Sequence, residues 1–179
     1  MLELLPQAYL LGLIMLLAAA AIVVLKQIIQ VRHDELIMAK FSGDNTTTQK
    51  PKDAAALYEL ASVQLRKRLY IQASDNLKQA LKFAEAEKAP QDAQAVIQNG
   101  LGFTLAAQSN YPAAVRRYRA ALRANPNYTV ALNNLAYALE KQFKIDEAQK
   151  LYKQVLELDI NNKTARRRMK LIERLNAST

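Results

Sequence analysis

Hydrophobic and small residues follow a helical period in two consecutive segments between Thr129 and Asn162. In the first segment they recur at the i, i+3, i+4, i+7 spacing of one helix face, at Leu132, Leu135, Ala136 and Leu139. In the second segment they fall at Ala148, Tyr152, Val155 and Leu156. Each apolar face needs a partner that excludes water, so the pattern predicts two helices packed against each other across a short turn.

The same pattern recurs upstream. Moving the register back by about 34 residues finds it over residues 95–128, at Leu101, Gly102, Leu105, Ala114, Tyr118 and Ala121. Pro126 then stops the second helix, because proline lacks an amide hydrogen and disfavours a helical residue before it. A weaker copy occupies residues 54–94, at Leu57, Leu60, Ala61, Ala73, Leu77, Ala80 and Leu81. This copy carries an insertion from Lys88 to Gln94, in which Pro90 marks the break before the next unit.

A helical hairpin repeated at about 34 residues, with small residues where its two helices cross, is typical of tetratricopeptide repeats. The sequence therefore predicts an all-α fold in which three repeats, residues 54–94, 95–128 and 129–162, stack into a right-handed solenoid. Residues 163–179 are predicted to form a C-terminal capping helix that covers the last repeat with Ala165, Met169 and Ile172. Three repeats are about the minimum for a stable stack, since each buries its apolar face only against a neighbour.

The N-terminal stretch from Leu4 to Leu25 contains no formal charge. As a helix rising about 1.5 Å per residue it would extend roughly 33 Å, enough to cross a hydrocarbon core of about 30 Å. A cleaved signal peptide and a buried core helix are less well supported. The apolar run is longer than that of a signal peptide, follows Glu3 rather than lysines, and is apolar on all sides. We therefore expect a transmembrane anchor helix with a juxtamembrane extension over residues 1–41.

A polar segment rich in turn formers follows the anchor, and it predicts a flexible linker over residues 42–53 in which Asp53 caps the first repeat helix. Positive charge lies on the C-terminal flank of the apolar stretch, at Lys26, Arg32 and Lys40. Only the amino terminus and Glu3 precede the stretch. The positive-inside rule then places the repeats on the cytoplasmic side, or on the stromal side in a plastid.

Candidate chemistry is sparse. The chain has no cysteine and one histidine, His33, beside Asp34 and Glu35. Sequence neighbours on a helix do not face the same way, so a solvated surface histidine is a better interpretation than a metal ligand. The glycines do not form a phosphate-binding loop, and the serines and acids do not group as a nucleophile or an acid–base pair. We expect no catalytic residue, no cofactor and no metal, and predict that the protein is not an enzyme.

A binding surface is predicted on the concave face, which positions 2, 5, 9, 12 and 13 of each first helix line. The candidate partner-binding residues there are Tyr58, Arg66, Asn99, Phe103, Asn133, Tyr137 and Lys141. The aromatics could anchor a protein partner, and the asparagines could bond an extended peptide backbone. Each aromatic could equally pack against its own neighbouring helix. Arg66 and Lys141 alone do not make a clamp for a peptide carboxylate, although Arg167 could contribute.

The net charge is +9, and much of it gathers in two segments. The predicted basic surface comprises Arg116, Arg117, Arg119, Arg123, Arg166, Arg167, Arg168 and Lys170. A solvated outer face, a contact with anionic lipid headgroups and an acidic partner all remain open. Nucleic acid is less favoured, since no known recognition motif accompanies the charge.

The short anchor MLELLPQAYLLGLIMLL, the polar linker and three tetratricopeptide repeats in one small chain resemble the membrane-anchored photosystem I assembly factors of cyanobacteria and chloroplasts. The resemblance implies a non-catalytic scaffold in the thylakoid membrane that binds photosystem I subunits or assembly intermediates through its repeats. A membrane-anchored tetratricopeptide adaptor in bacterial envelope biogenesis, serving secretion, pilus or cytochrome maturation, is the alternative. A nucleic-acid or lipid-surface binder acting through the arginines also stays open.

Overall fold

The structure is a computed structural model that describes residues 4–42 and 53–176. The chain divides into two compact units on either side of the boundary between Gln49 and Lys50. Except for its two end residues, the linker predicted for residues 42–53 lies outside the described residues.

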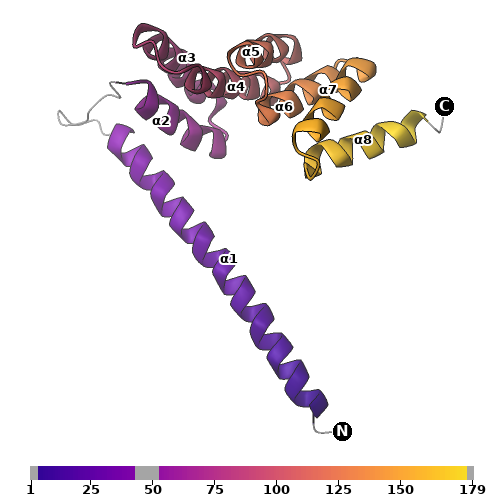
Figure 1. Ribbon diagram of the computed structural model, residues 1–179. Helices are drawn as coiled ribbons and strands as arrows, with labels where there is room; N and C mark the ends of the chain where they lie inside the picture. The colour runs from indigo at the N-terminus through magenta and orange to yellow at the C-terminus, as the bar shows by residue number, and fades with distance from the viewer. Residues whose placement is uncertain (1–3, 43–52, 177–179) are drawn as a thin grey trace. The chain divides into compact units, whose positions relative to one another are not determined.

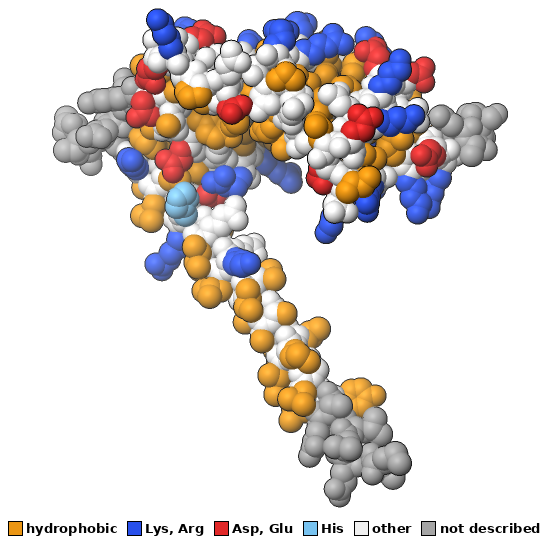
Figure 2. All heavy atoms as spheres, in the orientation of Figure 1, with side chains coloured by type: hydrophobic (Ala, Val, Ile, Leu, Met, Phe, Trp, Pro, Cys, Tyr) orange, Lys and Arg blue, Asp and Glu red, His pale blue; other side chains and the backbone are white. Residues whose placement is uncertain are grey.

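The first unit contains one long helix, α1 (Leu4–Ser42), which continues past the apolar stretch without a break (Figure 1). Its C-terminal part covers the juxtamembrane extension predicted within residues 1–41. The segment Tyr9–Phe41 is long and apolar enough to cross a membrane, by length and composition. Figure 2 shows hydrophobic side chains along the visible shaft of this helix. An apolar surface without a polar stripe suits a helix surrounded by lipid rather than one packed on a protein core.

The second unit consists of three helical hairpins and a closing helix (Figure 1). The hairpins are α2 (Ala54–Arg66) with α3 (Tyr70–Ala86), α4 (Gln91–Ala107) with α5 (Tyr111–Ala124), and α6 (Thr129–Glu140) with α7 (Ile145–Leu158). The closing helix is α8 (Lys163–Asn176). The all-α repeat stack with a C-terminal cap that the periodicity predicts is confirmed.

First helices of successive repeats contact each other directly, α2 with α4 and α4 with α6. Second helices pack chiefly on first helices, as α3 does on α2 and α4. The first helices therefore line the inner, concave side of the stack and the second helices its outer, convex side. The side chain of Asp53 accepts a hydrogen bond from the Ala56 amide at 2.7 Å, which confirms the predicted N-cap of α2.

The turn inside each hairpin has the same backbone geometry. The second-to-last residue of each turn lies in the left-handed region, with φ of 60° at Arg68, 61° at Ser109 and 60° at Phe143. The next amide donates to a carbonyl near the end of the first helix: Leu69 to Gln64 at 2.8 Å, Asn110 to Leu105 at 2.9 Å and Lys144 to Leu139 at 3.0 Å. This is the Schellman C-cap, here formed without its usual glycine.

The insertion in the first repeat is mostly helical rather than a loop. Helix α3 runs to Ala86 and has 17 residues, against 14 in α5 and α7. Helix α4 begins at Gln91, before the predicted repeat boundary at Ala95, and also has 17 residues. Pro90 sits at its N-cap, where its missing amide hydrogen costs nothing. Helix α3 thus runs about one turn further than α5 and α7, and the last four residues of the insertion form the first turn of α4.

The core of the repeats depends on small residues where helices cross. Ala61, Ala73, Ala136 and Ala148 are completely buried. At Gly102 a Cβ atom would lie 2.5 Å from Cε1 of Tyr118, whose side chain is only 2% exposed. The predicted packing role of Gly102 is therefore confirmed. Burial raises the pKa of Tyr118 and of its counterpart Tyr152 well above the ordinary tyrosine value.

Candidate partner-binding site

The N-terminal part of the concave side contains an apolar recess between α2 and α4. Its volume is about 470 Å³. Tyr58 and Val96 contribute to its walls, and three carboxylates, Asp53, Glu87 and Asp92, lie at its edge. The lining also includes Ala54, Ala55, Ala89, Ala93 and Ile97. Such a recess suits an apolar side chain of a partner that carries positive charge nearby.

The middle of the concave side presents Phe103, with 44% of its side chain exposed, beside asparagines that bond to other helices. Asn99 Oδ1 accepts from Asn134 Nδ2 at 2.9 Å. Burial is the main cause that raises the pKa of Tyr128. Asn133 Nδ2 donates to Asn162 Oδ1 at 3.1 Å. Asn99 thus ties the second repeat to the third, and Asn133 ties α6 to the residue before α8.

The C-terminal part of the concave side is built around Tyr137. Lys141 Nζ lies 5.4 Å from the centre of its ring, and the guanidinium carbon of Arg168 lies 4.7 Å from it. Arg168 donates to Glu140 Oε1 at 3.1 Å, and the Tyr152 hydroxyl donates to Glu140 Oε2, also at 3.1 Å. Cations stacked on an aromatic face hold the ring in place and leave positive charge beside it. Arg66, the remaining candidate, is exposed on α2.

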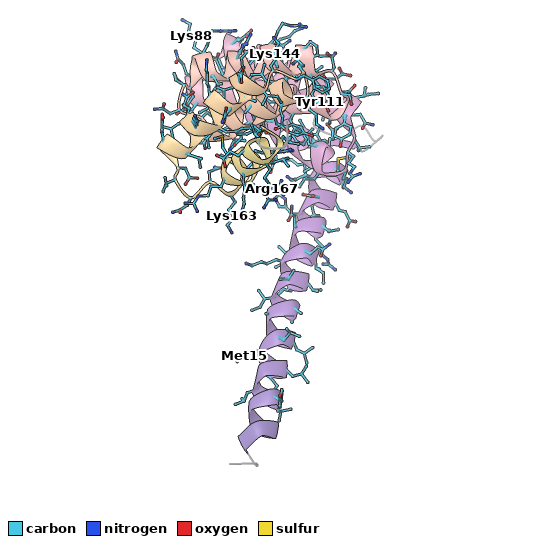
Figure 3. The ribbon with its side chains drawn as sticks, turned by 90° about the vertical axis from the view of Figure 1, so that its right-hand side faces the viewer. Met15, Lys88, Tyr111, Lys144, Lys163 and Arg167 are labelled. Atoms are coloured by element: carbon cyan, nitrogen blue, oxygen red, sulfur yellow. The ribbon has the colours of Figure 1, made fainter. Side chains whose placement is uncertain are left out.

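Arg168 is predicted to belong to the basic surface, but its side chain is only 23% exposed. Met169 and Ile172 are buried on α8, and Arg168 is adjacent to that buried face. Arg167, by contrast, is exposed, and Figure 3 shows it and Lys163 projecting from α8 away from the packed helices. The closing helix therefore contributes Arg168 to the concave groove, whereas the sequence suggested Arg167.

The other basic side chains differ in their partners. Arg119 pairs with Glu147 at 3.5 Å, and Arg117 donates to Gln98 Oε1 at 3.3 Å. Arg116, Arg123, Arg166 and Lys170 are exposed. Among the residues that the structure describes, no group of histidine and acidic side chains could hold a metal ion, and the side chain of His33 is mostly exposed on α1.

Comparison with known proteins places this geometry in a family. Two tetratricopeptide repeat profiles match residues 52–127 and 105–169. The ycf37 protein of Guillardia theta is 31% identical over 169 residues, which cover 94% of this chain and 93% of that relative. The chain belongs to the ycf37 family of tetratricopeptide repeat proteins. The family resemblance predicted from the sequence is thus confirmed.

Further similarities of this tetratricopeptide repeat protein agree with that assignment. The chloroplastic tetratricopeptide repeat domain-containing protein PYG7 of Arabidopsis thaliana is 31% identical over 166 residues, covering 90% of this chain and 52% of the relative. The first repeat domain of Spaghetti (RPAP3), bound to the HSP90 peptide SRMEEVD, aligns with a TM-score of 0.63 at 23% identity, over 70% of this chain and 94% of that one. The Sgt2 domain of Aspergillus fumigatus gives 0.61 at 18% identity, over 75% and 85%. These two structures establish the shared fold.

Proposed function

We propose that this protein is a non-catalytic, membrane-tethered assembly factor that binds photosystem I subunits or assembly intermediates through its concave side. The observation that carries the proposal is the row of accessible aromatics, Tyr58, Phe103 and Tyr137, on a repeat stack whose chain also has a helix fit to cross a membrane. Exposed aromatics in a groove are the side chains that most often anchor a protein partner.

The proposal also includes the membrane that holds the protein and the side on which its repeats lie. The similarity to a chloroplastic relative supports the thylakoid membrane. The positive residues after the apolar stretch, Lys26, Arg32 and Lys40, support repeats on the cytoplasmic or stromal side. Tethering keeps the repeat stack close to membrane subunits, which raises their effective concentration at the groove.

The test is affinity purification of the tagged full chain from gently solubilised native membranes, with co-purifying proteins identified by mass spectrometry. We expect photosystem I core subunits, and we expect Phe103→Ala to reduce their recovery at least fivefold. Phe143→Ala is the matched control, because Phe143 is 91% exposed in the turn before α7 and outside the groove. Recovery of secretion or cytochrome-maturation components instead would move the protein to the envelope-adaptor function. Equal recovery with both variants would exclude Phe103 as an anchor.

A further inference from the structure

A second recess lies on the convex side, between the second helices of the first two repeats. Its volume is about 470 Å³, and it is lined by residues of α3, α4 and α5: Ser74, Lys78, Gln98, Leu101, Leu105, Ala113, Arg116, Arg117, Ala120 and Arg123. On α5 the lining residues share one helix face, since each lies three or four positions from at least one other. Two alanines on that face leave room above the leucines of α4. The recess is a trough with an apolar floor.

Positive charge borders this trough on both sides. Lys78 comes from α3, and Arg116, Arg117 and Arg123 come from α5. Figure 2 shows Lys and Arg side chains gathered near α5. The sequence has no acidic residue between Ala95 and Leu139, so α4 after its first turn and all of α5 supply no carboxylate of their own.

The neighbouring charges leave part of this cation set unneutralised. Lys78 pairs with Asp75 at 3.1 Å, and Arg117 is held by the amide of Gln98. Among the described residues Arg116 and Arg123 have no acidic partner, whereas Arg119, which points elsewhere on α5, pairs with Glu147. Arg116 and Arg123 are seven positions apart, or about 10 Å along the helix axis. Carboxylates spaced at i and i+7 on a partner helix would match them.

We propose that this convex trough binds an acidic amphipathic helix of a partner protein. The apolar side chains of that partner helix lie on Leu105 and Ala120, and its carboxylates pair with the guanidinium groups of Arg116 and Arg123. Planar guanidinium groups match carboxylates through paired hydrogen bonds. Lipid fits less well, because a headgroup offers its charge at one point while its apolar tails stay in the bilayer. The trough, in contrast, places cations on both sides of an apolar floor. The proposal concerns a different face from the concave groove and can hold or fail without it.

The test uses the full chain in nanodiscs of phosphatidylcholine and a fluorescein-labelled helical peptide with Glu at i, i+3 and i+7 and Leu between. Fluorescence anisotropy at low salt should show binding that weakens steeply as salt rises. Arg116→Gln with Arg123→Gln should weaken it about tenfold, which corresponds to about 1.4 kcal/mol. Arg119→Gln with Arg166→Gln removes the same charge outside the trough and should change the affinity less than twofold.

Two further measurements separate the trough from charge alone. Ala120→Met fills the floor and keeps every cation, so it should also weaken binding about tenfold. The peptide with Gln in place of Glu should not bind. Equal losses from both arginine pairs, or full binding to Ala120→Met, would overturn the proposal. The proposal would also be overturned if phosphatidylglycerol in the nanodiscs weakened peptide binding to the native chain but not to the Arg116 and Arg123 variant. Lipid would then be the ligand of the trough.

Discussion

Replacing Gly102 with alanine tests the closest helix contact in the repeat stack. The added Cβ would lie 2.5 Å from Cε1 and 2.6 Å from Cδ1 of Tyr118, whereas carbon atoms in contact prefer about 3.5–4 Å. Tyr118 is buried and cannot swing into solvent, so α4 and α5 must move apart. Overpacking of this kind costs about 1–3 kcal/mol, and the better helix propensity of alanine returns about 1 kcal/mol. We expect a net destabilisation of about 1 kcal/mol.

Gly100→Ala is the matched control, because it makes the same change in the same helix. Its Cβ would lie 3.2 Å from two methyl groups of Leu77, which can yield by a few tenths of an ångström. The propensity gain should then dominate, and Gly100→Ala should be neutral or stabilising by up to about 1 kcal/mol. The difference between the two variants, about 2 kcal/mol, isolates the packing term because the propensity gain cancels.

The assay is urea unfolding of the full chain in detergent micelles, followed by circular dichroism at 222 nm. The midpoint should fall for Gly102→Ala with little change in the slope against urea. In a Tyr118→Leu background the added methyl group should no longer be harmful, because the ring edge is gone. If Gly102→Ala is as stable as Gly100→Ala, the close approach of α4 and α5 is refuted.

Two further predictions concern alkaline pH and the hairpin turns. Burial raises the pKa of Tyr118 and Tyr152 in the folded state, so unfolding releases their protons above pH ~10. The free energy of unfolding should therefore stay constant below that pH. Above it, the free energy of unfolding should fall by about 1.4 kcal/mol per pH unit for each tyrosine. Urea midpoints measured from pH 9 to 11 should show the fall, and Tyr118→Phe should make it smaller. An unchanged slope would contradict the assignment. Phe143→Gly should stabilise the fold by about 0.5–1 kcal/mol, because it relieves a left-handed backbone at a side chain that is almost fully exposed. A lower melting temperature for that variant would show that the Phe143 side chain makes a contact worth more than the strain.

Features with a local or periodic cause could be predicted from the sequence. The repeat register, the Gly102 contact and the Asp53 cap all follow from spacing and from residue types that favour one position. The extent of α1 beyond the apolar stretch follows from the lack of proline and glycine between Gln27 and Ser42. The early start of α4 could also have been found, because Pro90 followed by Asp92 is a common signal for the start of a helix.

Features that depend on how one helix docks on another could not be predicted from the sequence. Arg166, Arg167 and Arg168 are consecutive, and only the docking of α8 decides which of them turns toward Tyr137. A signal existed, since residue 168 lies at i+3 from Ala165 and four positions before Ile172, on the side of the buried face. The bond between Asn99 and Asn134 joins different repeats, and residue spacing alone does not reveal it. The hairpin turns lack the glycine that would have indicated their backbone geometry.

The helical insertion of the first repeat contributes to partner specificity rather than to the stacking of the repeats. One wall of the apolar recess between α2 and α4 consists of residues that belong to the insertion or adjoin it: Glu87, Ala89, Asp92 and Ala93. Without residues 88–94 the repeats 54–87, 95–128 and 129–162 would follow one another at the regular spacing of about 34 residues. We expect a chain without residues 88–94 to stack as regular repeats and to lose that wall. Evolution could therefore exchange the partner of this end of the solenoid by lengthening or shortening one hairpin, without rebuilding the scaffold.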